Sequence, residues 1–198
     1  MNQLIEFDPM QMIGLGVAAA LLVGLIFWWI YKLAHPSLEK QVEKTIKENS
    51  EDYAKDIVVS DGLYGYHFID YLVLLPGRIV VLGLHSFEGY IFGADKIEEW
   101  AQVLNNRSYK FENPLLKNSH YVQSVQELTR NTEVIGRVLF TGNCSFPKGI
   151  PEGVIELGQL PSMLDELKRD TDSEATKVLW DELLAACRQQ KNKYLNDK

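Results

Sequence analysis

The sequence predicts an α/β (α+β) domain, with a mixed central sheet flanked by helices, preceded by one N-terminal transmembrane helix. Three observations carry this prediction. Residues 12–31 contain no charged side chain, two apolar strand-type runs flank a Pro76-Gly77 turn, and helix-type periodicity is followed by a returning apolar strand at 134–141. The roughly 160 residues after the apolar segment are enough to bury one sizeable core.

The uncharged segment matches a membrane span in length. At 1.5 Å per residue, residues 12–31 cover roughly 30 Å, the thickness of a bilayer hydrocarbon core. Trp28 and Trp29 lie at one end, where amphipathic rings favour the headgroup level. A cleavable signal peptide fits poorly, because the preceding residues are acidic and the apolar run is too long. We predict a short extracytoplasmic N-terminus at 1–11 and a transmembrane helix at 12–32.

Charged residues around the span predict its orientation. No lysine or arginine precedes it, whereas four lysines follow it closely: Lys32, Lys40, Lys44 and Lys47. The positive-inside rule then places the C-terminal domain in the cytosol and the N-terminus outside, in a bacterial cytoplasmic (inner) membrane.

Small residues recur along the predicted span. Gly16, Ala20 and Gly24 are spaced four apart, which would let two spans approach closely and self-associate. The alternative is that glycine and alanine are simply common in membrane helices.

Elements after the span follow from periodicity and turn residues. Ser37 caps a helix to about residue 48, and Asn113-Pro114 opens another, to about residue 130, with Leu115, Val122, Val125 and Leu128 on one face. The expected strands are 57–59, 68–75, 78–84, 90–92, 97–103, 109–111, 134–141 and 154–157. Residues 96–104 could instead form a helix. Ser162 and Thr171 are expected to start two C-terminal helices, the second fraying near Lys191.

Composition excludes several classes of function. The formal net charge of −7 makes broad electrostatic affinity for nucleic acid unfavourable. Cys144 and Cys187 are far apart, without CxxC spacing, and are expected to be reduced thiols. The four histidines form no HxH or HExxH pattern, so the sequence predicts no histidine metal centre.

The order of these features resembles the nuclease-related domain (NERD) family, which is related to the PD-(D/E)XK nucleases. The resemblance covers roughly residues 38–141, and we place the NERD-like domain at 37–157 and the C-terminal helices at 158–198. The residues that carry it are Ile69-Asp70, Val80 to His85, Gly89 to Gly93, Trp100, Gln102, and Asn113-Pro114-Leu115 with Lys117-Asn118. Lys117 stands where the family often has glutamine.

The resemblance implies a metal-dependent nuclease site, which this sequence retains only in part. Phosphodiester hydrolysis needs a divalent metal held by carboxylates, and a neighbouring lysine stabilises the developing charge. Asp70 matches the family aspartate, but Gly83 and His85 replace the two ends of the family's Glu-x-Lys. Gly83 offers no ligand, and His85 is neutral for much of the time near pH 7. We therefore predict that nuclease activity is absent or very weak.

Two acidic residues could rescue the site. Glu43 lies on the leading helix and Glu88 just past the second strand, so both could converge with Asp70 and His85 on a metal. The simpler alternative, which we favour, makes Glu43 a solvated helix residue and Glu88 a turn residue. Asp70 itself could be a buried carboxylate satisfied by backbone N–H groups or by a nearby Lys or Arg. Trp100 is expected to pack in the core or at its rim.

These observations predict a single-pass membrane protein whose cytosolic domain is catalytically inactive and acts as a binding or scaffold module. The alternative is a membrane-tethered Mg-dependent nuclease with a rearranged site, in which Asp70 would be the metal ligand. A third hypothesis is a subunit of a membrane complex, assembled through the small-residue stripe and the last helix. We expect no cofactor outside the nuclease alternative, and nucleic acid is not the favoured partner.

Overall fold

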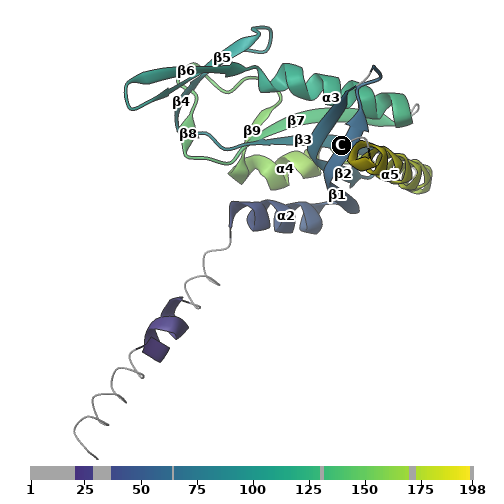
Figure 1. Cartoon of the computed structure of the whole chain (residues 1–198), viewed down its shortest axis with the longest axis horizontal. Helices are drawn as coiled ribbons and strands as arrows, with labels where there is room; N and C mark the ends of the chain where they lie inside the picture. The colour runs from purple at the N-terminus through teal and green to yellow at the C-terminus, as the bar shows by residue number, and fades with distance from the viewer. Residues whose placement is uncertain (1–20, 29–36, 64, 130–131, 170–172, 197–198) are drawn as a thin grey trace, which may run out of the picture. The chain divides into compact units, whose positions relative to one another are not determined.

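The computed structural model describes residues 21–28, 37–63, 65–129, 132–169 and 173–196 (Figure 1). The chain divides into two compact units, Met1–Gln41 and Val42–Lys198, each considered by itself.

In the first unit, residues 21–28 are helical and their large apolar side chains are exposed. Within the described ranges, no helix is both long enough and apolar enough to cross a membrane. Most of the predicted span, 12–20 and 29–32, lies outside the described residues, as do Gly16 and Ala20. The predicted span therefore stays a prediction.

In the rest of the described chain, six consecutive strands separate the first two helices, and three more strands precede the C-terminal helices (Figure 1). In order, they are α2 (Leu38–Asn49), β1 (Asp52–Ser60), β2 (Tyr66–Leu75), β3 (Arg78–His85), β4 (Gly89–Phe92), β5 (Glu99–Leu104), β6 (Arg107–Glu112), α3 (Pro114–Thr129), β7 (Glu133–Phe140), β8 (Cys144–Ser145), β9 (Val154–Glu156), a 3-10 turn (Leu157–Gln159), α4 (Leu160–Glu166) and α5 (Ser173–Asn196).

Two mixed sheets form the framework. The larger has the order β1-β2-β3-β7-β9, with β1, β2 and β3 antiparallel and with β3, β7 and β9 parallel. The smaller has the order β6-β5-β4-β8. Pro76 and Gly77 form the two-residue turn between β2 and β3, and Gly77 has a φ of 70°, which glycine adopts without strain. The predicted mixed sheet and central hairpin are confirmed.

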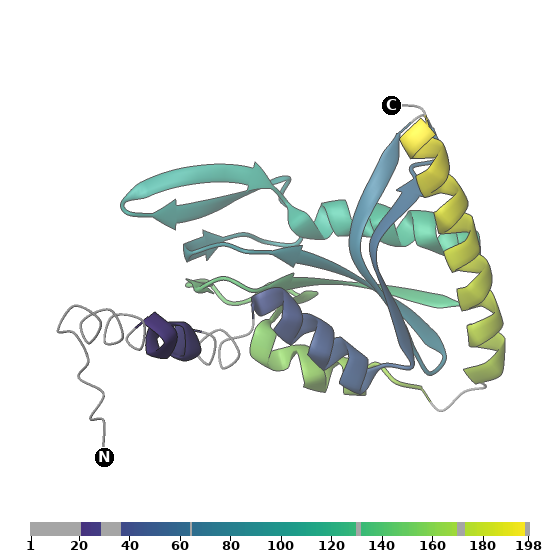
Figure 2. The same cartoon turned by 60° about the horizontal axis from the view of Figure 1, so that its bottom comes forward.

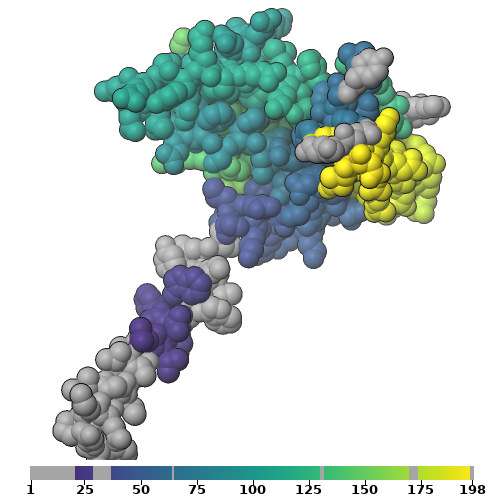
Figure 3. Space-filling model, viewed as in Figure 1, coloured from purple at the N-terminus to yellow at the C-terminus, as the bar shows by residue number. Residues whose placement is uncertain are grey.

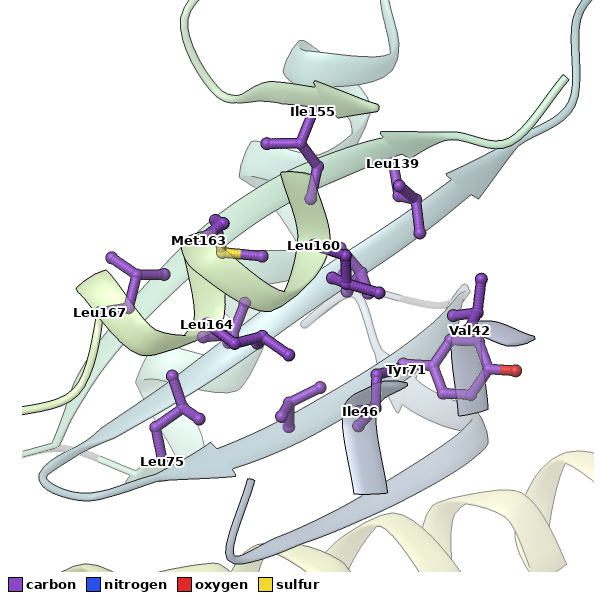
Figure 4. Packing of buried hydrophobic residues seen from close by; sticks show 13 residues of the cluster. Val42, Ile46, Tyr71, Leu75, Leu139, Ile155, Leu160, Met163, Leu164 and Leu167 are labelled. Carbon is purple, nitrogen blue, oxygen red and sulfur yellow. The ribbon is translucent and has the colours of Figure 1, made fainter. Parts of the chain in front are cut away.

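Helices cover both faces of the larger sheet (Figure 2). On one face, Val42 and Ile46 of α2 pack with Tyr71 and with the apolar side of α4 (Figure 4). On the other face, Tyr121 and Val125 of α3 and Trp180, Leu183 and Cys187 of α5 pack on the alternate residues of the same strands. Residues 71–75 of β2 and 78–83 of β3 are buried from both sides, which explains the near-continuous apolar sequence around the hairpin turn.

Helix α5 packs against the first strand, β1. Figure 3 shows the yellow end of this helix next to the blue surface of the early strands. Trp180 is 2% exposed, and its Nε1 donates a 2.8 Å hydrogen bond to Asp52 Oδ2. The helix continues past Lys191 to Asn196, so the predicted fraying near Lys191 is wrong. Packing on the sheet stabilises turns whose charged sequence suggested a loose tail.

Other boundaries also differ from the predictions. The first strand covers Asp52–Ser60 and not only 57–59, because its pairing with β2 extends over polar residues. Helix α4 begins at Leu160, ahead of Ser162, and Thr171 lies outside the described residues. The alternative helix at 96–104 is wrong: β5 and β6 form a hairpin, with Asn105 and Asn106 at φ of 50° and 59° in its turn.

The buried face of α3 matches the predicted one in part: Val125 is fully buried, and Leu115 and Val122 are half-buried and pack against the core. Leu128 is exposed, and the buried side chains include Asn118, Tyr121, Ser124 and Thr129. Gly136 on β7 permits this close packing, since a methyl group there would lie 2.8 Å from Asn118 Nδ2. Asn118 can occupy this buried face because its side chain forms hydrogen bonds with the backbone of the strands. The spacing of apolar residues in the sequence does not reveal such bonds.

Candidate functional site

Strands β2 and β3 bring the predicted site residues together. Tyr71 pairs with Leu82 at the end of the antiparallel ladder. The next residue on each strand is Asp70 on β2 and Gly83 on β3, so these two lie side by side. The side chain of Asp70 is turned back toward β3, where its Oδ2 accepts a 2.7 Å hydrogen bond from the backbone N–H of Leu84. Asp70 is exposed, so it is a carboxylate at the site surface with one fixed oxygen, and the alternative of a buried carboxylate is wrong.

Gly83 leaves room next to this carboxylate. A methyl group built at Gly83 would lie 4.0 Å from Asp70 Oδ2 and 3.7 Å from Asn118 Oδ1, both ordinary contact distances. The position of the family glutamate therefore lies next to Asp70, as the resemblance implies. Because the residue here is glycine, no side chain extends from it toward Asp70 Oδ2 or Asn118 Oδ1.

Helix α3 forms the opposite wall of the site. Asn113 fixes where the helix begins: its Oδ1 accepts from the Leu115 N–H at 2.9 Å, and its Nδ2 donates to carbonyls of the preceding loop, at 2.7 Å for Ile97. From that start, Lys117, Asn118 and Tyr121 reach the ends of β2 and β3. A pocket of about 170 Å³ lies between them, and its lining residues are Phe68, Asp70, Gly83, Leu84, His85, Pro114, Lys117, Asn118 and Tyr121.

Asn118 is the most buried polar side chain of this pocket, at 4% exposure. Its Nδ2 donates to the carbonyl oxygens of Val81, at 3.3 Å, and Arg137, at 3.1 Å. Two carbonyl acceptors on one side require the amide nitrogen there, so the amide oxygen must face Gly83. Within the described part of the chain, Asn118 Oδ1 has no hydrogen-bond partner.

His85 sits at the aromatic end of the pocket. Its ring stacks on Phe87 at 6.0 Å and tilts against Phe140 at 5.9 Å, measured between ring centroids. Burial lowers the pKa of His85; Asp70 opposes this lowering, and Lys117 adds to it. The imidazole is therefore neutral at pH 7 and cannot supply the fixed positive charge of the family lysine.

Tyr121 and Lys117 share one side of the helix, four residues apart. Burial raises the pKa of the Tyr121 phenol, and a hydrogen bond and the positive charge of Lys117 partly offset the rise. The pocket therefore combines a protonated phenol with the side chains of Asp70 and Lys117. The sequence signal for this wall was Lys117-Asn118 followed by Tyr121 at helical spacing, and the predictions drew no site role from it.

Glu43 lies away from this pocket. Its Oε1 accepts hydrogen bonds from Lys55 Nζ at 2.6 Å and from the Tyr71 hydroxyl at 3.4 Å. Tyr71 is the neighbour of Asp70 on β2, and successive residues of a strand point to opposite faces. Figure 4 shows the Tyr71 ring beside Val42 and Ile46, on the face opposite α3. Glu43 is therefore not brought together with Asp70.

Glu88 is not part of the pocket lining either. Its side chain is exposed, and its backbone carbonyl accepts a 2.8 Å hydrogen bond from Gln102 Nε2, which ties the loop after β3 to β5. Over the described residues, no three side chains among His, Cys, Asp and Glu gather in a way that could hold a metal ion.

Trp100 belongs to the core and not to the site. It is fully buried, its Nε1 donates to the Ala94 carbonyl at 3.1 Å, and it packs near Phe111 and Phe140. The prediction of core packing is confirmed. Cys144 and Cys187 are both free thiols, and burial raises the pKa of Cys187 to about 11.

Comparisons with known proteins identify the family of the chain. The nuclease-related domain model matches residues 37–141, more than half of the 198-residue chain. An uncharacterised protein of Bacillus anthracis is 25% identical over 81 residues, which cover 40% of this chain and 38% of that protein. The chain thus matches about two fifths of the length of this curated relative. No solved structure gives a significant match. The chain belongs to the nuclease-related domain (NERD) family.

Proposed function

We propose that this protein is a membrane-anchored NERD protein whose domain acts as a binding module and does not hydrolyse phosphodiesters. One observation carries the proposal: the space beside Asp70 that a second carboxylate would occupy is bordered by Gly83. Asp70 is the single acidic residue that lines the pocket in the part of the chain described.

The chemistry of hydrolysis explains why this matters. A metal-bound water attacks phosphorus efficiently when carboxylates position the metal and a fixed cation stabilises the developing charge. Here the strand supplies Gly83 in place of a ligand and a neutral, ring-stacked His85 in place of the lysine. The two positions on β3 therefore lack the carboxylate and the fixed positive charge that hydrolysis requires.

Membrane anchoring rests on the sequence. Residues 12–32 have the length and composition of a span, and the lysines after it favour a cytosolic domain in the cytoplasmic membrane. The exposure of the apolar side chains in the helical residues 21–28 fits a segment that has its environment in lipid. Self-association through Gly16, Ala20 and Gly24 is part of the same proposal.

A rearranged, metal-dependent nuclease is the second candidate. The observation that favours it is Lys117, because α3 brings this ammonium group into the pocket that contains Asp70. A lysine from the helix could replace the one missing from the strand. The pocket would still have a single carboxylate, which is why we rank this candidate second.

Restoring the missing groups tests the first proposal. The full chain in nanodiscs would carry Gly83→Glu with His85→Lys, and cleavage of DNA and RNA would be followed with Mg²⁺ or Mn²⁺. We expect the double variant to gain metal-dependent cleavage that wild type lacks. Wild-type cleavage as fast as that of the double variant would overturn the proposal and support the rearranged nuclease.

A further inference from the structure

We infer that this pocket binds a divalent cation between the Asp70 carboxylate and the Asn118 amide oxygen. Asn118, on α3, would take over the ligand role that Gly83 cannot fill. The inference rests on the proposed function only in using the same pocket, because cation binding can be measured whether or not phosphodiesters are cleaved.

The first observation is the orphaned oxygen of Asn118. A buried amide oxygen without a partner is destabilising, so native structures seldom leave one unsatisfied. Its orientation is fixed, because Nδ2 is committed to the carbonyls of Val81 and Arg137. If the amide were flipped, Oδ1 would face two carbonyl oxygens and could not form a hydrogen bond with either. The oxygen therefore faces the space beside Gly83, where it can accept a hydrogen bond or bind a cation.

The second observation is that a carboxylate oxygen borders the same space. One point, the methyl position of Gly83, lies 3.7 Å from Asn118 Oδ1 and 4.0 Å from Asp70 Oδ2. Asp70 Oδ2 is fixed in place by the Leu84 N–H, which uses only part of its capacity as an acceptor. Two oxygens whose positions are fixed by hydrogen bonds of their own side chains thus border the same position, which is left without a side chain at Gly83.

Oxygen ligands of this kind suit a hard divalent cation. Mg²⁺ normally binds through one or two carboxylates and keeps several waters, so one carboxylate and one amide oxygen are sufficient protein ligands. Mn²⁺ accepts the same ligands. A divalent cation bound in this way would polarise a phosphate oxygen of a ligand.

The charge of Lys117 sets the expected strength. Its ammonium group lines the same pocket and opposes a second positive charge. The site should therefore bind cations weakly, and removal of this charge should tighten binding. This relation separates a true site in the pocket from surface carboxylates that bind Mn²⁺ elsewhere, because Lys117 has no reason to affect those.

Gly83→Ala gives the sharpest test. The added methyl group meets its neighbours at ordinary contact distances, so the fold is expected to tolerate it while the space between the two oxygens is filled. Gly158→Ala is the matched control, since a methyl group there meets nothing within 4 Å. Asp70→Asn and Lys117→Met complete the set, and circular dichroism checks that each variant is folded.

Mn²⁺ binding to the full chain in nanodiscs would be measured by electron paramagnetic resonance of the free ion, without nucleic acid. We expect at least tenfold weaker binding at this site in Gly83→Ala and in Asp70→Asn. Gly158→Ala should leave the affinity unchanged, and Lys117→Met should raise it several-fold. Absence of binding in wild type, or equal binding in wild type and Gly83→Ala, would overturn the inference and leave water as the partner of Asn118.

Discussion

The backbone N–H of Leu84 donates a 2.7 Å hydrogen bond to Asp70 Oδ2, across two neighbouring strands of the sheet. This bond gives Asp70 a structural role whatever chemistry the pocket performs. It also holds the carboxylate beside Gly83, where the family site has its second acid. The residue with the strongest family resemblance is therefore both a fold residue and a site residue.

Two substitutions of Asp70 separate these roles. Asp70→Ala removes the acceptor for the Leu84 N–H and should lower the free energy of unfolding by about 0.5–1.5 kcal/mol. Asp70→Asn keeps an acceptor oxygen and should cost clearly less. Urea unfolding of the full chain, followed by tryptophan fluorescence, measures both. Equal losses in the two variants would show that the hydrogen bond contributes nothing measurable.

The last helix is expected to be essential for the stability of the sheet. Trp180→Ala removes a buried indole ring and its hydrogen bond to Asp52, and should cost about 3–5 kcal/mol. Val178→Ala on the same helix is the control, because Val178 is 56% exposed and surface changes usually stay within about 0.5 kcal/mol. Thermal unfolding compares the two. Similar melting temperatures would contradict the packing of α5 on β1 and β2.

Acid should destabilise the fold through His85. Burial lowers its pKa in the folded state below the ordinary value of about 6.5, so the unfolded chain takes up a proton first as the pH falls. The free energy of unfolding should therefore decrease from about pH 7 downward and level off below the folded pKa. The lowered pKa of His67 acts in the same direction.

The test is urea unfolding at intervals between pH 5.5 and pH 8. His85→Gln lacks the titrating group, so its stability should depend less steeply on pH than that of wild type. Identical slopes for the variant and wild type would rule out a contribution from His85.

The predicted span can be tested in membranes. Gly16→Leu and Gly24→Leu place large side chains on the small-residue stripe and should reduce crosslinked dimers strongly, because the helices could no longer approach closely. Gly14→Leu, outside the four-residue spacing, is the matched control. Dimers that persist in both stripe variants would exclude self-association through this stripe.

Much of the fold was predictable from local patterns. The Pro76-Gly77 hairpin, the Asn113-Pro114 helix start and the returning strand β7 all follow from turn residues, capping and apolar runs. The first strand was predicted too short, because residues 52–55 include two charged side chains and owe their strand conformation to pairing with β2. Tertiary pairing overrides local propensity there.

The site was only half predictable. Asp70, Gly83 and His85 were identified by resemblance, and their juxtaposition follows from one hairpin register. The contribution of α3 was missed because it depends on how deeply the helix packs, which Gly136 and the bonds of Asn118 to two strand carbonyls determine. Glu43 and Asp70 are likewise separated because they lie on opposite faces of the sheet. The number of residues between two distant elements does not predict which face each of them occupies.

The rate of metal-dependent cleavage by wild type, compared with Asp70→Asn, tests the central claim most directly. Full-length protein in nanodiscs would be incubated with single- and double-stranded DNA and RNA in Mg²⁺ or Mn²⁺, under single-turnover conditions. We predict that wild type and Asp70→Asn show the same background rate, because the pocket has one carboxylate and no lysine on β3. Cleavage by wild type that disappears in Asp70→Asn would contradict the account.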